Sequence, residues 1–388
     1  MTSFNFASTP ILHFGPGRIS VLHATIKSFG RRVLLVTGAR SFISSPVGIT
    51  IMEELLSTTE LQHSTIGHEP SPVMIDDTVR KISNKPVDVV VAIGGGSVLD
   101  AGKAISAMLP LNGPVKDYLE GVGTKTHSGV KLPFIAIPTT AGTGSEATKN
   151  AVLSETGEHG YKKSLRHNNF VPDIAIIDPA LAIHCPKSTT ASSGMDAFTQ
   201  LLESYLSTSS NPVTDALAHE GLKKVAGALT KAYSDAYDID ARSDMALAAY
   251  LSGITLANAG LGLVHGFASS IGGFFEIPHG IICSCMMTAA NKITVRQLRS
   301  GNRDSIALRK YAAIGKEFAG SHDRPEDYYV DFLLNLMESW STMMHIPRLS
   351  ETGVKSSDIT KIADVTENKN NPVQLNREQI IEVLEMAL

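Results

Sequence analysis

The feature that most constrains how this chain folds is an apolar run, residues 87–93, that passes directly into three glycines, residues 94–96. A short run of this kind is typical of a parallel strand that is covered on both faces. Helical spacing follows over residues 98–109, and Ser97 is placed to cap that helix at its N-terminus. A buried strand that leads through glycines into a helix is one unit of an α/β domain.

Three further apolar runs repeat this pattern. They cover residues 32–37, 133–137 and 173–177. One stretch with helical spacing follows the first run and ends at about residue 56, and another covers residues 71–84. Alternating strands and helices predict a doubly wound, Rossmann-like domain, in which ligands bind at the carboxyl ends of the strands.

The second half of the chain has a different pattern. Helical spacing dominates from about residue 186, and helices are expected at residues 191–206, 212–233, 243–258, 305–318, 328–345 and 377–387. A length of 388 residues suits two domains. We therefore predict an α/β domain over residues 1–185 and an all-α domain over residues 186–388.

Composition excludes some classes of function. Lys and Arg number 34 against 38 Asp and Glu, which gives a formal net charge of −4, and aromatic residues make up only 6%. A mildly acidic chain with few aromatic residues is not typical of nucleic-acid-binding proteins, so no nucleic acid is expected as a partner. The 3 cysteines are too few for a disulfide framework, and they indicate a reducing, cytoplasmic location.

One stretch, residues 245–275, contains no Asp, Glu, Lys or Arg and is long enough to cross a membrane. However, it is rich in Gly, Ala, Ser and Asn, it contains His265, and no basic cluster flanks it. We therefore interpret it as a pair of helices buried in the helical domain, and we expect neither a membrane anchor nor a signal peptide. A histidine in such a place needs a partner or a role.

Two loops at predicted strand ends have the composition of a dinucleotide-binding site. Glycines let the backbone approach a phosphate closely, and the N–H groups of a helix N-terminus point toward it. The candidate residues are Gly95, Gly96, Ser97 and Asp100 in the first loop and Thr139, Thr140, Thr143 and Ser145 in the second. Asp100 is expected in the first helical turn, where the helix dipole favours an acid, or in contact with the cofactor. Either loop alone also fits a turn without a ligand, but two at adjacent strand ends favour a dinucleotide.

A third group of residues could hold a metal. We expect residues 194–200 to begin a helix, which places Asp196 and Gln200 one turn apart on the same face. His265 and His279 add two imidazoles from a region poor in charge, and one carboxylate with two histidines can bind a divalent metal. A histidine satisfied within the core is the alternative for His265, and Cys283 and Cys285 are interpreted as buried thiols.

These residues, in this order, resemble the iron-containing (metal-dependent, group III) alcohol dehydrogenases. The resemblance runs from Thr9-Pro10 through residues 94–97 and 138–140 to residues 194–196 and His279-Gly280. It implies the dehydroquinate synthase-like / iron-containing alcohol dehydrogenase fold, with a dinucleotide-binding α/β domain, a helical metal-binding domain and the active site between them. It also implies that the nicotinamide cofactor is contacted by Gly95, Gly96, Ser97, Thr139, Thr140, Thr143, Ser145 and Lys162, and that the metal ligands are Asp196, His265 and His279.

The chain departs from that family at two positions. Gln200 stands where family members usually have a histidine, so it is only a candidate ligand, and the site looks more like the Asp-His-His arrangement of the zinc glycerol dehydrogenases. Ser269 stands where many members have a histidine that relays a proton, and a serine cannot act as a base near neutral pH. We expect one divalent ion, iron or zinc.

The function predicted from these observations is a metal-dependent, NAD(P)-linked alcohol dehydrogenase or aldehyde reductase. It would transfer hydride between the nicotinamide and a small alcohol or aldehyde, and the family resemblance implies a homodimer. One alternative is the lyase chemistry of dehydroquinate synthase on the same fold. Another is a binding protein whose catalytic site has degenerated at Gln200 and Ser269.

The choice of nicotinamide is predicted from the end of the strand at residues 32–37. An acidic residue there would bind the adenosine 2′-OH and repel a 2′-phosphate, but this chain has Gly38. Arg40 and Ser41 could bind a phosphate, although a solvated loop residue and a helix cap are the alternatives for them. The sequence therefore favours NADP(H), or the use of both cofactors.

Overall fold

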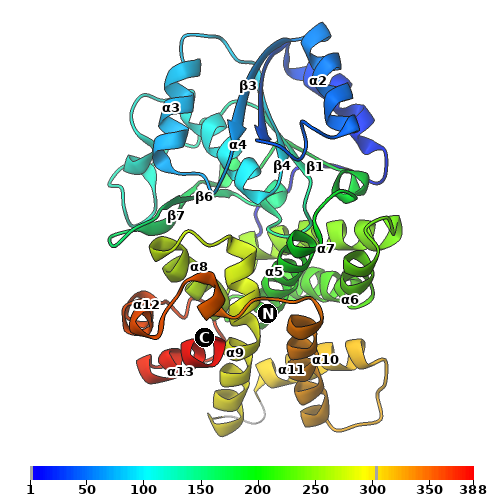
Figure 1. The fold of residues 1–388 in the computed structure, drawn as a ribbon, viewed down its shortest axis with the longest axis vertical. Coiled ribbons are helices and arrows are strands. Elements are labelled where there is room, and N and C mark those ends of the chain that lie inside the picture. The colour runs from blue at the N-terminus through cyan, green and yellow to red at the C-terminus, as the bar shows by residue number, and fades with distance from the viewer. Residues whose placement is uncertain (1–2, 302–304) are drawn as a thin grey trace.

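The computed structural model describes residues 3–301 and 305–388, which form an α/β part followed by a helical part (Figure 1). Six parallel strands make the main sheet, in the order β1-β8-β5-β4-β2-β3. Their bounds are Ile11–Phe14 for β1, Arg32–Gly38 for β2, Glu60–Ile66 for β3, Val89–Gly94 for β4, Phe134–Pro138 for β5 and Ile174–Ile177 for β8. This arrangement confirms the predicted doubly wound domain.

Both faces of the sheet are covered, as the apolar runs require. Alternate residues of β2 point to opposite sides: Val33 and Leu35 pack against α1 (Leu22–Phe29) and α2 (Pro46–Thr58). Leu34 and Val36 pack with residues of α3 (Pro72–Ile82) and α4 (Gly96–Met108). The predicted strands are confirmed, with small shifts at their ends.

Four strands were not predicted. β1 and β3 lie at the two edges of the sheet, where the polar sequence of β3 meets solvent and no apolar run is needed. The other two, β6 (Asn150–Glu155) and β7 (Tyr161–Arg166), form a separate antiparallel hairpin beside α4. That hairpin carries Lys162.

The start of α4 corrects two predictions. Ser97 does not cap the helix, because the capping residue is Gly95 and the helix already begins at Gly96. The carbonyl of Gly95 accepts the N–H groups of Val98 and Leu99 at 3.0 and 3.1 Å. Asp100 does not lie in the first turn either, where no acidic residue is present. No side chain caps this helix, so its first N–H groups remain available to a ligand.

The helical part contains α5 (Lys187–Leu206), α6 (Pro212–Ser234), α7 (Ile239–Ala259), α8 (Leu263–Phe274), α9 (His279–Gly301), α10 (Ile306–Ala319), α11 (Glu326–Met343), α12 (Ile359–Val365) and α13 (Arg377–Ala387). The expectation that residues 194–200 begin a helix is wrong, because α5 starts at Lys187 and Asp196 lies mid-helix. We propose the domain boundary at residues 185/186, which falls between β8 and α5.

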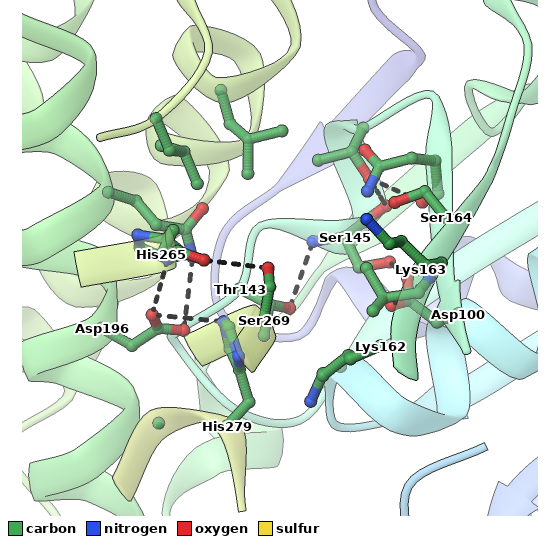
Figure 2. A pocket seen from close by; sticks show the side chains of 18 of the residues that line it. Asp100, Thr143, Ser145, Lys162, Lys163, Ser164, Asp196, His265, Ser269 and His279 are labelled. Carbon is green, nitrogen blue, oxygen red and sulfur yellow. Dashed lines mark hydrogen bonds and ion pairs between the residues drawn. The ribbon is translucent and has the colours of Figure 1, made fainter. Parts of the chain in front are cut away.

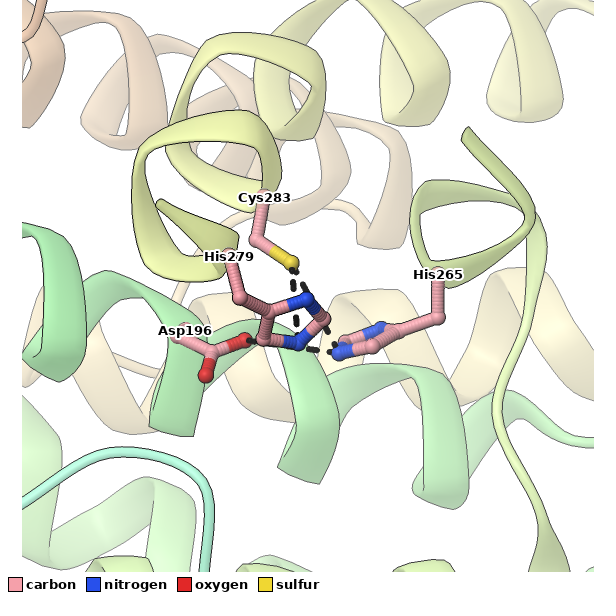
Figure 3. Close-up of side chains that lie close together, drawn as sticks. All are labelled: Asp196, His265, His279 and Cys283. Carbon is pink, nitrogen blue, oxygen red and sulfur yellow. Dashed lines mark hydrogen bonds and ion pairs between the residues drawn. The ribbon is translucent and has the colours of Figure 1, made fainter. Parts of the chain in front are cut away.

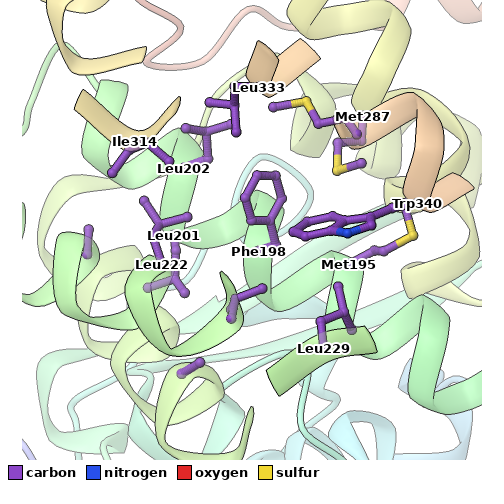
Figure 4. Close-up of a cluster of buried hydrophobic side chains, with 14 of the residues drawn as sticks. Met195, Phe198, Leu201, Leu202, Leu222, Leu229, Met287, Ile314, Leu333 and Trp340 are labelled. Carbon is purple, nitrogen blue, oxygen red and sulfur yellow. The ribbon is translucent and has the colours of Figure 1, made fainter. Parts of the chain in front are cut away.

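The core of the helical part is centred on aromatic packing between α5 and α11 (Figure 4). The rings of Phe198 and Trp340 meet edge to face with their centroids 5.1 Å apart. Leu201 and Leu202 of α5 extend this core. A second cluster joins α8 and α9 to α12 and α13. α5 therefore sits at the centre of the helical part, with one side toward the sheet.

The stretch without charges forms α7 and α8, which confirms the predicted helix pair. Among the described residues no single helix is long and apolar enough to span a membrane, and these two pass that test only as a pair bent by 94°. Most of their residues are buried among other helices. α9, which begins at His279, was not predicted.

Candidate active site

A cavity of about 740 Å³ lies between the carboxyl edge of the sheet and the helical part, within the usual range for small-molecule and cofactor sites. Figure 2 shows side chains of both parts facing each other across it. Twelve of the predicted site residues line it: Gly95, Gly96, Ser97, Asp100, Thr140, Thr143, Ser145, Lys162, Asp196, Gln200, His265 and His279. Gly38 and Thr139 do not.

The strand register explains how the two predicted loops meet. Gly94 at the end of β4 is paired with Pro138 at the end of β5, so both loops leave the sheet at the same level. The contact is close: a Cβ on Gly96 would lie 2.6 Å from Thr143, whereas one on Gly95 would lie 3.4 Å from Thr140. Glycine at position 96 is therefore required for the loop to lie against the N-terminus of α4.

Gly38 and Thr139 lie at strand ends but do not line the cavity. Gly38 ends β2, which is the neighbour of β4 in the sheet. The backbone N–H of Thr139 donates to the carbonyl of Gly94 at 2.9 Å. Thr139 therefore joins β5 to β4 through its backbone. Gly38 lies at the end of the next strand, β2, outside the cavity.

Asp100 and Lys103 hold the second loop in place. One oxygen of Asp100 accepts from the Ser145 hydroxyl at 2.5 Å, and the other accepts from the N–H of Val152 at 3.0 Å. The buried ammonium of Lys103 donates to the carbonyl of Ser145 at 2.8 Å and to the hydroxyl of Thr148 at 2.7 Å. Although Asp100 lines the cavity, its carboxylate is already engaged with the protein, and burial raises its pKa.

The metal-site candidates come together from three helices. Asp196 of α5, His265 of α8 and His279 of α9 converge at one end of the cavity (Figure 3). Oδ1 of Asp196 lies 3.3 Å from Nε2 of His265 and 3.7 Å from Nε2 of His279. The side chain of Asp196 is only 1% exposed, so this carboxylate is shielded from water.

These residues fit a divalent metal, since buried polar atoms without partners converge here. Oδ1 of Asp196 and Oε1 of Gln200 are buried and accept no hydrogen bond, which is costly unless another group satisfies them. The amide N–H₂ of Gln200 is occupied, since it donates to Oδ2 of Asp196 at 3.3 Å and to the carbonyl of Gly142 at 3.5 Å.

The charge states also suit a cation. Burial would raise the pKa of Asp196, but the neighbouring imidazoles of His279 and His265 hold it at about 2. Burial lowers the pKa of His279 to about 4, against the pull of Asp196. At neutral pH Asp196 is therefore ionised and His279 is neutral, the forms in which these groups bind metals. Burial would lower the pKa of His265, but Cys283, Asp196 and Glu203 raise it well above its usual value, so this ring has to release its proton when a metal binds.

Three residues near this site were missed from the sequence. Glu203 accepts from Nδ1 of His265 at 2.7 Å, which turns Nε2 toward Asp196. Cys283 lies one turn after His279, and its sulfur faces the same site. Lys369 donates to the carbonyl of His265 at 2.8 Å and to the hydroxyl of Ser269 at 3.1 Å. Glu203 lies two turns after Asp196 on the same helix, and this spacing was the one sequence signal that could have placed it beside the proposed metal ligands.

Lys162 also has a partner that was not predicted. Its ammonium lies 3.1 Å from the carboxylate of Glu69, and both residues line the cavity. The ion pair therefore fixes the lysine ammonium at the wall of the cavity.

The geometry thus combines an uncapped helix N-terminus, a hydroxyl-rich loop and a cluster of candidate metal ligands around one cavity. The sequence profile of the family described as iron-containing alcohol dehydrogenase matches residues 9–179, and that of its C-terminal part matches residues 190–388. The chain belongs to the iron-containing alcohol dehydrogenase family.

Individual family members agree with this assignment. The chain is 33% identical to alcohol dehydrogenase 4 of Saccharomyces cerevisiae, over 98% of each chain. It is 34% identical to the NAD-dependent methanol dehydrogenase of Bacillus methanolicus, over 73% of this chain and 74% of that one. Among solved structures, a 1,3-propanediol oxidoreductase has a TM-score of 0.87 at 28% identity, with 100% of both chains covered.

Members of the iron-containing alcohol dehydrogenase family use NAD(P) and iron or another divalent metal. This chain is accordingly an NAD(P)-linked oxidoreductase that acts on alcohols, as predicted. The lyase alternative is not favoured, because the relatives are named dehydrogenases. The predicted fold is confirmed as well.

Proposed function

We propose that Asp196, His265 and His279 hold one divalent metal, and that the site interconverts small alcohols and aldehydes beside a nicotinamide. The convergence of these three side chains at one end of the cavity carries the proposal. The uncapped N-terminus of α4 and the loop with Thr140 and Thr143 line the same cavity. A dinucleotide bound along the sheet would therefore reach the metal ligands.

When bound, the metal supplies a Lewis acid for the substrate oxygen and the nicotinamide supplies or accepts hydride. The N–H groups at the start of α4 would bind the pyrophosphate. Gly95, Gly96 and Ser97 would let that group approach, and the hydroxyls of Thr140 and Thr143 would orient the cofactor. Lys162, which pairs with Glu69 in this structure, would contribute a positive charge. Thr139 would support the loop through its backbone bond to Gly94, Gly38 would lie beside the adenosine ribose, and Asp100 holds Ser145 in position.

The metal assignment is tested by elemental analysis of purified variants. Asp196→Ala should abolish metal retention and turnover while far-UV circular dichroism stays unchanged, because one ligand and one buried charge are removed together. Replacing His265 and His279 with alanine should have the same effect. His219→Ala, in a helix away from the cavity, serves as the control. Full turnover by a metal-free Asp196→Ala protein would contradict the proposal.

For the nicotinamide, we propose NADP(H), or both cofactors, because Gly38 leaves no carboxylate beside the adenosine ribose. The nearby Arg40 is exposed, and its guanidinium would suit a 2′-phosphate. A relative is named NAD-dependent, so NAD(H) is the competing assignment.

The substitution Gly38→Asp tests this proposal and fits the structure, since a Cβ there meets only Val98 and Ser41 at 3.9 Å or more. It should shift the preference toward NAD(H) by ~1–3 kcal/mol, the scale of a charge-assisted hydrogen bond. The ratio of kcat/KM for the two cofactors measures the shift, and Gly38→Asn is the uncharged control of the same size. A wild-type enzyme that strongly prefers NADH, with no response to Gly38→Asp, would contradict the proposal.

We also propose a cytoplasmic homodimer. Cys185, Cys283 and Cys285 are all free thiols in the structure, which suits a reducing compartment. The dimer rests on the family assignment, and sedimentation equilibrium of the purified enzyme tests it. A monomer at all concentrations measured would contradict it.

A further inference from the structure

Cys283 faces the proposed metal site from the protein interior. Its sulfur lies 3.7 Å from Nε2 of His265 and 3.7 Å from Nε2 of His279, the two ring nitrogens that face Asp196. The residue is fully buried, and Figure 3 shows its sulfur pointing toward both rings. The sulfur also contacts the carboxylate of Asp196.

Four of the six separations between the donor atoms are close to those of a tetrahedral centre. With zinc–nitrogen and zinc–oxygen bonds of about 2.0–2.1 Å and a zinc–sulfur bond of about 2.3 Å, tetrahedral geometry places O and N about 3.3 Å apart and N and S about 3.6 Å apart. The observed distances are 3.3 and 3.7 Å from the carboxylate oxygen to the two nitrogens, and 3.7 Å from the sulfur to each nitrogen. All four atoms lie within 4.8 Å of one another.

The local structure holds the sulfur in this position. His279 and Cys283 are one turn apart at the start of α9, so their side chains project from the same face of that helix. Glu203 fixes the ring of His265 through Nδ1 at 2.7 Å and leaves Nε2 toward the sulfur. The unpartnered, buried oxygen of Asp196 completes the set.

Gln200 is the competing fourth ligand, because its buried Oε1 also lacks a hydrogen-bond partner. Its N–H₂ group donates to Oδ2 of Asp196 at 3.3 Å and to the carbonyl of Gly142 at 3.5 Å, which orients the amide and leaves that oxygen free. However, an amide oxygen is a much weaker ligand than a thiolate for a borderline metal such as zinc. Asp196, Gln200, His265 and His279 line the cavity, whereas Cys283 lies behind them. Four protein ligands fill a tetrahedral centre, so a substrate oxygen arriving from the cavity side would bind as a fifth ligand, an expansion that catalytic zinc sites allow.

From this geometry we propose that the Cys283 thiolate is the fourth protein ligand, which makes the site an Asp-His-His-Cys centre that selects zinc over iron. The inference rests on the proposed metal site and specifies it further. Binding involves no redox change: the metal–sulfur bond forms as the thiol releases its proton to solvent. A thiolate in place of an oxygen or nitrogen donor favours the softer metal.

Cobalt(II) substitution of the metal-free protein tests the proposal through an optical signal that does not depend on turnover. A cobalt–thiolate bond gives an intense charge-transfer absorption in the near ultraviolet, which oxygen and nitrogen ligands do not give. Wild-type protein should show this band at one cobalt per chain. Cys283→Ser should still bind cobalt but lose the band, and Gln200→Ala should keep it.

Cys285→Ser is the matched control, because Cys285 lies on the same helix and its sulfur contacts the carbonyl of Pro347 at 3.0 Å instead. Its variant should keep the band. Competition with a chelator gives a second readout: Cys283→Ser should weaken zinc binding roughly ten- to a hundredfold, at least the scale found when a single supporting group of a metal site is lost. Cys283→Ala guards against new coordination by the serine oxygen.

The outcomes separate this inference from the proposed function. Cobalt bound by the wild-type protein without the charge-transfer band would overturn the assignment of Cys283 and leave Asp196, His265 and His279 in place. A band that persists in both Cys283 variants would also overturn it. Failure of the wild-type protein to bind cobalt or zinc would overturn the metal site as a whole.

Discussion

At the residue scale, the glycines at the start and in the middle of α4 have different roles. Gly95 and Gly96 adjoin the cavity, whereas Gly102, two turns into α4, packs against the sheet. A Cβ on Gly95 would make ordinary contacts with Thr140 at 3.4 and 3.5 Å. A Cβ on Gly102 would lie 2.6 Å from Ala92 and 3.0 Å from Phe134, closer than real side chains approach.

Substitutions of Gly95 and Gly102 should therefore affect cofactor binding and stability separately. Gly95→Ala should leave the unfolding temperature nearly unchanged but raise KM for the nicotinamide about tenfold, or ~1.4 kcal/mol, because the methyl group obstructs the pyrophosphate. Gly102→Ala should destabilise the protein by about 1–3 kcal/mol through overpacking, with little change in KM. Thermal unfolding and steady-state kinetics measure both effects. Equal losses of stability in the two variants would contradict the distinct roles.

At the element scale, Asp88 joins two strands of the sheet. It precedes β4, and its carboxylate accepts from the backbone N–H groups of Arg31 and Arg32, both at 3.0 Å, and from Nε of Arg32 at 2.9 Å. These bonds, first of all that from the guanidinium, lower its pKa to about 2. In sequence Asp88 only interrupts an apolar run, whereas in the structure it fixes the start of β2 beside β4.

We expect Asp88→Asn to lower the free energy of unfolding by about 1 kcal/mol near neutral pH, a value reduced for partial solvent exposure. Because the folded-state pKa is below the unfolded one, the stabilisation is full above about pH 4 and is lost as the pH falls toward 2. Urea unfolding at several pH values measures it. Asp77→Asn, at an exposed pair with Arg80, is the control and should have no effect. A difference that grows on acidification would contradict this explanation.

At the scale of the whole molecule, the proposed metal would link three helices that are distant in sequence. Its ligands come from α5, α8 and α9, and α5 also carries the central core residue Phe198. The single tryptophan, Trp340, packs on Phe198 and so reports on the helical part by fluorescence. Metal binding and the stability of this core should therefore be coupled.

Removing the metal should lower the unfolding temperature that Trp340 fluorescence reports, because only the folded state binds the ion. At a free metal concentration of about 1,000 times Kd the coupling amounts to ~4 kcal/mol. Chelation followed by addition of zinc should reverse the shift, and the chelator should have no effect on Asp196→Ala. If wild-type protein unfolds at the same temperature with and without metal, the three helices are not linked in this way.

The sequence by itself determined the parts of the molecule that depend on local pattern. Apolar runs of β-length identified the buried strands, since a strand covered on both faces has no place for polar side chains. Glycine- and threonine-rich loops at those strand ends predicted where a dinucleotide would bind, and helical spacing placed Asp196 and Gln200 on one face. The edge strands β1 and β3, which are half exposed, carry no such pattern and were missed.

Only the tertiary structure decided what surrounds the proposed metal site. His265, His279 and Asp196 lie on different helices, and nothing in their sequence spacing required them to meet. Packing of α5, α8 and α9 brought them together, with Glu203 and Cys283 beside them. Cys283 had the properties of an ordinary buried thiol in sequence, because its approach to the two histidines is a long-range contact. The physical reason is general: helix periodicity is encoded locally, whereas the convergence of ligands is set by how whole helices pack.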